Sequence, residues 1–305
     1  MITTTKTTTT VVRMLQYRAT WRSVFMPRPR LRHSLPIFVL VAGVLFGCKV
    51  EPLQPQPAAS APLSGVGQPL AAAAASAPAT TWQQIDSAME LRSARFDVNG
   101  QAGHLTMVRL DPASYSIRVK YDVANAGSLR EWYEAIKPLA IINGGYFDQQ
   151  GKATALVIFD GIRTGESYEG FGGMVVVNAQ GQFELRSLRQ QPFDPDETLQ
   201  QAMQSSPMLI QPGGVVSDLE PDNDRSRRSV IARDIHGRIL LIVSDTNTFT
   251  LPELANVLKN SDLELDAALN LDGGSSTGLY VKTDQANVQV DSFDKLPLVL
   301  VVQRR

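Results

Sequence analysis

Residues 270–281 contain the side chains best suited to chemistry. The apolar residues 265–271 predict a buried strand, and residues 277–281 predict a second strand. Between them, Asp272 is followed by two glycines and two serines. Glycine lets backbone N–H groups turn toward an anion, and serine hydroxyls add donors. The segment is either a tight turn without chemistry or a site for a polar or anionic ligand. Its length favours a site, because a two-residue hairpin needs only the glycines.

A second glycine pair, Gly144 and Gly145, occurs in a similar setting. It follows Asn143 at the end of a short apolar strand, residues 139–142, and precedes two aromatic residues. Arg227 and Arg228 stand together at another strand start. Because side chains alternate along a strand, the two arginines are expected on opposite faces.

These segments recur in an order that resembles the phosphodiester glycosidase family, relatives of the lysosomal uncovering enzyme. That enzyme removes N-acetylglucosamine from a sugar-1-phosphodiester. The resemblance covers roughly residues 85–303 and implies an α+β fold and the hydrolysis of a glycosyl phosphodiester. It rests on residues 142–147, 206–209, 227–231, 241–245, 251–254 and 271–276.

For such a substrate, Asp272 is the first candidate carboxylate, as nucleophile, base or oxocarbenium stabiliser. The alternative is a carboxylate that only caps its turn. Asp148 and Asp245 are further candidate catalytic carboxylates, and each also has a structural interpretation. The expected donors to the phosphate or the sugar are Gly273, Gly274, Ser275 and Ser276.

Asn143, Gly144 and Gly145 are expected to form the opposing wall, with the Asn143 amide bonding sugar hydroxyls. Tyr146 or Phe147 would lie against the sugar face. Alternatively, the glycines permit close strand packing and the aromatic residues belong to the core.

Arg228 is the expected phosphate clamp, because a guanidinium grips two phosphate oxygens at once. Arg227 would point to the other face. Asp245 would orient Arg228 or act as a second acid. An exposed strand-edge arginine pair is the alternative.

The periodicity of residues 81–305 predicts one α+β domain, with a mostly antiparallel or mixed β-sheet core and a few packed helices. Ser128 and Glu131 match a capping box that begins a helix ending near residue 136. Residues 251–260 predict a second helix, and residues 196–204 a third. Residues 82–89 are compatible with an opening helical turn.

The first 80 residues predict export rather than a fold. A basic segment, residues 26–33, precedes the apolar residues 35–47 and a lipobox-like match that ends at Cys48, so residues 1–48 read as a signal and lipobox segment. Residues before Met26 are interpreted as the result of a translation start assigned too far upstream. Residues 49–80 are rich in Pro, Ala and Ser and predict a flexible tether. We therefore expect lipidation at Cys48 and anchoring to the bacterial envelope, at the outer membrane facing the periplasm. The alternative is that Cys48 is a buried residue in an ordinary signal anchor.

Composition excludes several other classes. Eight of the 29 Lys+Arg and one of the 30 Asp+Glu precede Thr81, so the remainder carries 21 basic and 29 acidic residues, a net charge of −8. An acidic domain is a poor nucleic-acid partner. Cys48 is the only cysteine, which excludes disulfides and a cysteine nucleophile from the domain.

Metal binding has little support in the sequence. Only His104 and His236 remain after residue 80, which argues against a multi-histidine zinc site or a Ser-His-Asp triad. The acidic residues of 218–224 predict a solvated loop rather than a calcium site. We expect no cofactor, and leave open whether a divalent metal helps hold a phosphate. The oligomeric state is likewise open.

Three functions remain in view. The first is a hydrolase of glycosyl phosphodiesters in envelope or extracellular glycans. The second is a lipoprotein that binds a sugar phosphate or wall glycan without turning it over. The third is a structural envelope module whose glycines serve only the fold.

Overall fold

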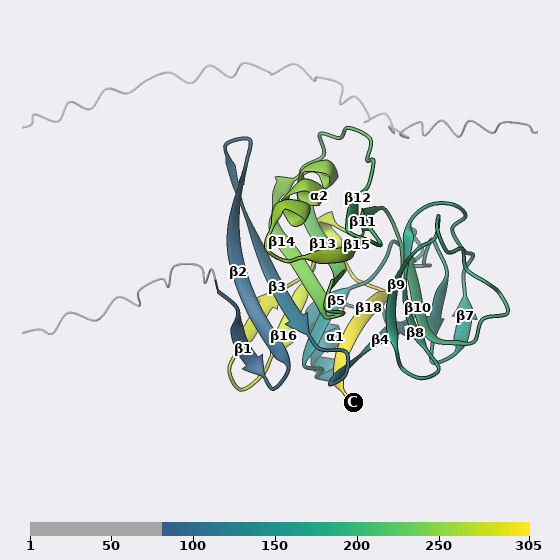
Figure 1. Cartoon of the computed structure of the whole chain (residues 1–305). Helices are drawn as coiled ribbons and strands as arrows, with labels where there is room; N and C mark the ends of the chain where they lie inside the picture. The colour runs from purple at the N-terminus through teal and green to yellow at the C-terminus, as the bar shows by residue number, and fades with distance from the viewer. Residues whose placement is uncertain (1–80) are drawn as a thin grey trace, which may run out of the picture. The chain divides into compact units, whose positions relative to one another are not determined.

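The computed structural model describes residues 81–305, which form three antiparallel β-sheets and two α-helices (Figure 1). All strand pairs assigned in this part of the chain are antiparallel. The expectations for the signal segment, Cys48 and the tether concern residues outside this range.

The largest sheet has eight strands, and helix α2 (Leu251–Asn260) covers one of its faces. Their order across the sheet is β1 (Gln83–Asp86), β2 (Met89–Val98), β3 (Gln101–Leu110), β14 (Ile239–Phe249), β13 (Ser226–Asp234), β15 (Leu265–Asn270), β11 (Met208–Gln211) and β12 (Val215–Val216).

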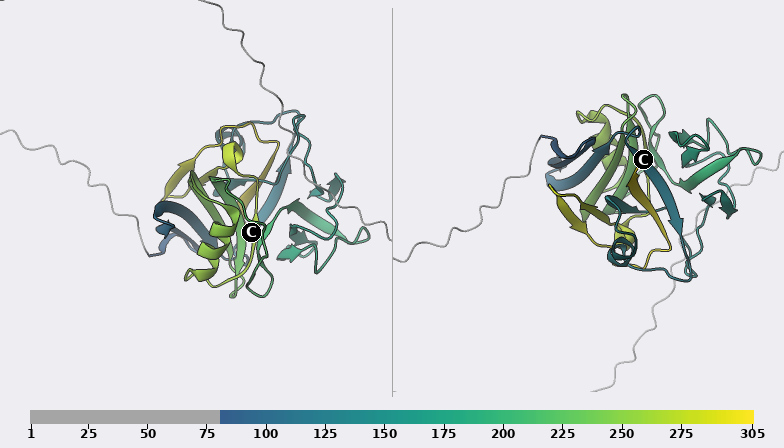
Figure 2. Two further views of the ribbon diagram at one scale, coloured as in Figure 1. Left: turned by 90° about the horizontal axis from the view of Figure 1, so that it is seen from above. Right: turned by 90° about the horizontal axis from the view of Figure 1, so that it is seen from below.

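The second sheet has five strands, and helix α1 (Leu129–Ile136) lies over its outer face. The order is β17 (Asn287–Val290), β16 (Leu279–Lys282), β5 (Ala140–Asn143), β18 (Leu298–Arg304) and β4 (Tyr115–Tyr121). The two helices are seen over different sheets in the views from above and below (Figure 2).

The third sheet also has five strands. Its order is β7 (Ile162–Thr164), β6 (Val157–Phe159), β10 (Leu199–Ser205), β8 (Gly173–Asn178) and β9 (Phe183–Ser187). Buried residues from all three sheets form one apolar cluster, so the sheets share a core. Along β14, Leu241 and Val243 face this core while Leu240 and Ile242 face α2, as strand alternation requires.

Both helices begin where the sequence predicts. The Ser128 side chain accepts from the Glu131 N–H and the Glu131 carboxylate accepts from the Ser128 N–H. Thr250 and Glu253 make the same reciprocal pair at the start of α2. Each box satisfies two N–H groups that the first helical turn leaves free, which explains the exact starts.

The helical content is lower than the sequence indicates, and the domain is more β-rich than a typical α+β fold. Residues 196–204 are not a helix: β10 occupies most of this segment and pairs with β6 and β8. Two glutamines of this segment, Gln201 and Gln204, are buried. Gln201 accepts from the Val119 N–H at 2.8 Å and Gln204 from the Tyr168 N–H at 2.8 Å.

The helical turn proposed for residues 82–89 is also wrong, because β1 pairs with β2 there. Neither helix in residues 81–305 is long and apolar enough to cross a membrane.

Candidate functional site

The two glycine segments meet in the structure. Asn143 ends β5 and Asp272 follows β15, 129 positions later. The Asn143 Nδ2 donates to the Asp272 carbonyl at 2.7 Å, and the Asp272 N–H donates to the Gly144 carbonyl at 3.0 Å. The contact joins the end of β15, an interior strand of the eight-stranded sheet, to β5 of the five-stranded sheet under α1.

Asn143 is fully buried, and its amide is occupied by protein groups. Its Oδ1 accepts from the Ser229 hydroxyl at 2.7 Å and from the Gly278 N–H at 3.1 Å. The side chain therefore ties β5, β13 and the segment before β16 together. We predicted contact with sugar hydroxyls, but the structure turns this amide inward and gives it a positioning role.

Gly144 and Gly145 serve close packing. A Cβ on Gly144 would lie 2.6 Å from the Leu298 Cγ, and one on Gly145 would lie 2.6 Å from the Gln204 carbonyl oxygen. Their N–H groups donate to the Leu298 carbonyl at 2.9 Å and to the Met203 Sδ at 3.1 Å. The structure thus indicates that Gly144 and Gly145 allow close packing of the strands rather than contact with a ligand.

Asp272 is half-buried, and its surroundings favour the protonated form. Burial raises the pKa of this carboxyl to about 6. Hydrogen bonds from the Ser276 hydroxyl and the Gly273 N–H lower the pKa, but their effect is smaller than that of burial. The charge of Asp294 raises the pKa further. A carboxyl that titrates near neutrality is typical of a catalytic acid or base.

The glycine–serine turn after Asp272 leaves two backbone donors free. Gly274–Ser276 form one 3₁₀ turn, and the Gly273 N–H bonds the Asp272 Oδ1 at 2.9 Å. No residue of the described chain accepts from the Gly274 or Ser275 N–H. Gly274 has φ +59° and open space where a side chain would stand, so the turn is uncovered above it.

Arg228 lies beneath this turn with one nitrogen unpaired. The side chain is 7% exposed; its Nε donates to the Phe249 carbonyl at 3.1 Å, and its Nη2 binds the Asp224 carbonyl and lies 3.6 Å from the Asp224 carboxylate. Its Nη1 lies 3.9 Å from the Cβ position of Gly273 and has no partner among residues 81–305. A buried guanidinium therefore directs one free nitrogen at the turn.

Tyr146 is the aromatic residue near Asp272. Its hydroxyl accepts from the Asn270 Nδ2 at 2.8 Å. Burial raises the pKa of Tyr146, as does the charge of Asp272, whereas Arg228 lowers it. Phe147 points elsewhere and packs with the cluster under α1, so its predicted contact with a sugar is not supported.

The other predicted carboxylates are not brought to the site. Asp148 is exposed, and its Oδ1 accepts from the Gln150 and Lys152 N–H groups at 2.9 Å each, which caps a turn. Asp245 is exposed, and its charge acts on Arg227. Asp272 is thus the one predicted catalytic carboxylate that the structure places beside the turn and Arg228.

The two serines have different surroundings. Ser276 is buried beside Asp272, whereas Ser275 is exposed and its hydroxyl binds the Asp294 carboxylate. Sequence reasoning assigned no role to Asn270, although a polar residue at the end of a buried strand is a usable signal. Asp224, Ser229 and Asp294 were assigned no role in this site, because only the tertiary structure brings them to this place.

Within residues 81–305, no group of three or more His, Cys, Asp or Glu side chains is placed to hold a metal ion. In the acidic loop, Asp222 accepts from the Asp224 N–H at 2.5 Å and from the Leu251 N–H at 3.3 Å. These carboxylates therefore serve the loop and the start of α2.

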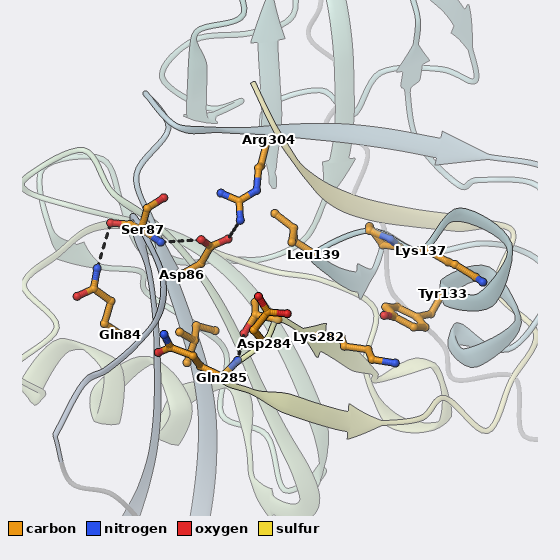
Figure 3. A pocket seen from close by; sticks show the side chains of 13 residues that line it. Gln84, Asp86, Ser87, Tyr133, Lys137, Leu139, Lys282, Asp284, Gln285 and Arg304 are labelled. Carbon is orange, nitrogen blue, oxygen red and sulfur yellow. Dashed lines mark hydrogen bonds and ion pairs between the residues drawn. The ribbon is translucent and has the colours of Figure 1, made fainter.

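A cavity of about 670 Å³ lies away from Asp272 (Figure 3). It is bordered by β1, residues 137–139 and the turn after β16, with the Asp86–Arg304 ion pair on one side. Leu139 precedes β5 and Lys282 ends β16, so the cavity is at the opposite ends of the strands that lead to Asn143 and Gly278. It is separate from the candidate site.

The structure is a β-rich domain in which two glycine-containing segments bring Asp272 and the turn after it next to the buried Arg228. The chain belongs to the phosphodiester glycosidase family, whose model matches residues 137–303. No curated protein sequence matches the chain.

Two solved structures share the fold at low identity. The zebrafish N-acetylglucosamine-1-phosphodiester alpha-N-acetylglucosaminidase catalytic domain, auto-inhibited by its pro-peptide, is 18% identical with a TM-score of 0.58. The match covers 75% of this chain and 87% of that one. A hypothetical protein from Synechocystis is 16% identical with a TM-score of 0.55, over 76% of this chain and 65% of that one.

Proposed function

We propose that the protein hydrolyses a glycosyl phosphodiester, breaking the bond between the anomeric carbon and the phosphate oxygen. Water supplies the new hydroxyl on the sugar, and the phosphate leaves as a monoester. The observation that carries this proposal is the placing of Asp272 beside two free N–H groups and the unpaired Nη1 of Arg228. Family membership supports the reaction class.

The phosphate of the substrate would bind at the turn. Its oxygens accept hydrogen bonds from the Gly274 and Ser275 N–H groups and from the Arg228 Nη1, which are preorganised donors of the kind that stabilise developing negative charge. Since Arg228 is already held by Phe249 and Asp224, its side chain loses little conformational entropy on binding.

The sugar would lie on the Tyr146 and Asn270 side of the turn, with its anomeric carbon at Asp272. A phosphate monoester is a stable anion, so the leaving group needs less protonation than the alcohol of an ordinary glycoside. One carboxylate is therefore enough for bond cleavage. Asp272 acts as nucleophile, base or electrostatic stabiliser of the oxocarbenium-like transition state.

One feature of the described residues favours a competing function: of the predicted catalytic carboxylates only Asp272 lies beside the turn, and the nearby Asp294 carboxylate is bound by the Ser275 hydroxyl. Asp148 and Asp245 lie elsewhere, and most glycosidases use a pair of carboxyl groups. On this alternative, the domain binds a sugar phosphate or a cell-wall glycan without cleaving it.

The proposed location follows from the first 80 residues. The basic and apolar segments before Cys48 and the tether after it support a lipid-anchored protein of the bacterial envelope, at the outer membrane facing the periplasm. The substrates would then be envelope or extracellular glycans that carry sugar-1-phosphodiesters.

The direct test is turnover of methyl α-N-acetylglucosaminyl phosphate by the wild type and by Asp272→Asn. We expect the substitution to lower kcat about 100-fold or more, because it removes the charge while keeping the shape. Binding of the diester, measured by calorimetry, should persist. Asp97→Asn, an exposed carboxylate on β2, is the matched control and should retain full activity.

Saturable binding with no turnover in the wild type would favour the binding function. Full activity in Asp272→Asn would reject the role assigned to this carboxylate.

A further inference from the structure

The cavity beside β1 (Figure 3) adjoins a second hollow of about 250 Å³ between α1 and β17, and Tyr133 and Lys282 line both. We call the two together the α1 groove, bordered by α1, β1, β16 and β17. Its floor is β16, where Tyr280 and Lys282 share the face toward α1 because residues two apart in a strand point the same way. The helix covers Tyr280 but leaves the neighbouring Asn287 and Gln289 of β17 exposed, so this part of the sheet face is open.

Three polar side chains of the groove have no partner within residues 81–305. The Tyr133 hydroxyl makes no hydrogen bond there, and the side chains of Lys282 and Asp284 make neither a hydrogen bond nor an ion pair. Figure 3 shows the Tyr133 hydroxyl directed toward the cavity. These groups are therefore free to bind a ligand.

Tyr133 is held rigidly although its hydroxyl is free. The residue is 9% exposed, and its ring stacks on Tyr280 with 5.4 Å between the centroids and 25° between the planes. The Tyr280 hydroxyl in turn accepts from the Arg130 Nε at 3.3 Å. A ligand that bonds the Tyr133 hydroxyl thus meets a group already in position, and little conformational entropy is lost.

The groove carries charges of both signs. Asp86 and Arg304 form one ion pair, and Arg130 lies 3.4 Å from the Asp291 carboxylate. The charged side chains that line the groove outside these pairs are two of each sign: Lys137, Lys282, Glu134 and Asp284. A field of mixed sign does not favour an anion such as phosphate.

The free groups match a ligand that is rich in hydroxyls. The Lys282 ammonium only donates hydrogen bonds, the Asp284 carboxylate only accepts them, and the Tyr133 hydroxyl does both. A sugar hydroxyl also donates and accepts, so neighbouring hydroxyls of one ring can satisfy all three. Gln84, Gln285 and other uncharged polar residues complete the lining.

We infer that the α1 groove is a second sugar-binding site, which holds an uncharged part of a glycan that is not cleaved there. Lys282 stands three residues beyond Leu279, about 10 Å along the strand, at the end of β16 away from Gly278 and Asp272. The sugar held in the groove is therefore not the one at Asp272. This argument does not depend on the proposed hydrolysis.

A second site changes how a polymer is used. Once one segment of a glycan is held in the groove, contact between another segment and the Asp272 turn is intramolecular, which raises the effective concentration of that segment.

The probes are chitotetraose and cellotetraose, two neutral tetrasaccharides with and without acetamido groups. Neither carries a phosphate for the turn after Asp272. Their dissociation constants are measured by calorimetric titration of the full-length protein at neutral pH. We expect saturable binding of at least one tetrasaccharide, without competition from inorganic phosphate.

Tyr133→Phe removes one hydroxyl and keeps the ring on Tyr280, and should weaken this binding about two- to tenfold. Asp284→Asn and Lys282→Ala should weaken it to a similar degree, because each removes a charged hydrogen-bonding partner. Lys152→Ala is the matched control for Lys282→Ala. Lys152 is exposed and lines neither hollow, so its replacement should leave the affinity unchanged.

Failure of both tetrasaccharides to bind, an unchanged affinity in Tyr133→Phe, or displacement of the sugar by inorganic phosphate would overturn the inference. Turnover of methyl α-N-acetylglucosaminyl phosphate by Tyr133→Phe is measured in parallel and should equal that of the wild type. Tyr133-dependent sugar binding in a protein that hydrolyses no phosphodiester would leave the second site standing and reject only the proposed hydrolysis.

Discussion

At the scale of single residues, the site depends on how burial changes the acidity of one carboxyl. Asp272 is half-buried, and burial raises its pKa to about 6, while local hydrogen bonds from Ser276 and Gly273 limit the rise. At neutral pH the group is mostly ionised, and one unit below its pKa it is mostly protonated. The protonation state of Asp272 therefore changes within the pH range where the domain is expected to be folded.

The pH dependence of kcat/KM distinguishes the roles left open for Asp272. As nucleophile, base or electrostatic stabiliser it must be ionised, so kcat/KM should rise about tenfold per pH unit below pH 6 and level off above it. As a general acid it would produce the reverse, a fall above pH 6. Initial rates on methyl α-N-acetylglucosaminyl phosphate between pH 4.5 and 8 measure this.

Any residual activity of Asp272→Asn should not show the change of kcat/KM with pH near pH 6, because the titrating carboxyl is gone. A wild-type profile that is flat between pH 4.5 and 7 would show that this carboxyl does not control the reaction.

At the scale of elements, Asn143 explains how strands from two sheets hold the turn in place. Its amide joins the Asp272 carbonyl, the Ser229 hydroxyl and the Gly278 N–H, which belong to three different segments. The glycines after it let β18 and β10 approach to contact distance. These residues act on the site through position, not by touching substrate.

Asn143→Ala should lower the free energy of unfolding by about 2–5 kcal/mol, because it leaves three buried polar groups without their partner. Chemical denaturation of the purified protein measures this. Asn125→Ala is the matched control; this exposed loop asparagine bonds only Asp122, and its replacement should cost under about 0.5 kcal/mol. A cost for Asn143→Ala as small as that of the control would refute the positioning role.

At the scale of the whole molecule, the protein combines a β-rich domain with an N-terminal segment that predicts export and anchoring. The three sheets of residues 81–305 share one core and bring the ends of β5 and β15 together. The proposed anchor at Cys48 would hold this domain at a membrane surface, with residues 49–80 as the tether between them.

Cys48→Ala should move the protein from the membrane fraction to the soluble fraction when it is expressed in a bacterial host. Incorporation of labelled palmitate should fall to background, because Cys48 is the only cysteine in the chain. Fractionation followed by immunoblotting measures the first effect, and autoradiography the second. Label that persists in Cys48→Ala, or wild-type protein found wholly in the soluble fraction, would contradict the anchor.

Local sequence signals predicted those elements whose stability is local. The capping box at Ser128 acts within four residues, and α1 begins where it indicates; α2 begins at Leu251, as predicted, and the structure adds a capping box at Thr250. The helix wrongly predicted where β10 lies shows the limit of local signals. Gln201 and Gln204 form hydrogen bonds with residues far away in the sequence, and no local pattern reveals such partners.

The sequence by itself indicated one α+β domain with a mostly antiparallel or mixed β-sheet core, a resemblance to the phosphodiester glycosidases, and Asp272 and Arg228 as candidates for chemistry. Residue type and spacing are sufficient for these conclusions, because propensity and alternation are properties of short segments.

Only the tertiary structure decided which candidates lie together. It placed Arg228 under the turn that follows Asp272, turned Asn143 inward, and directed Tyr146 rather than Phe147 toward the site. The physical reason is that burial, unpaired donors and pKa shifts depend on neighbours far apart along the chain. The sequence lists these groups, and the packing of the sheets determines which of them meet.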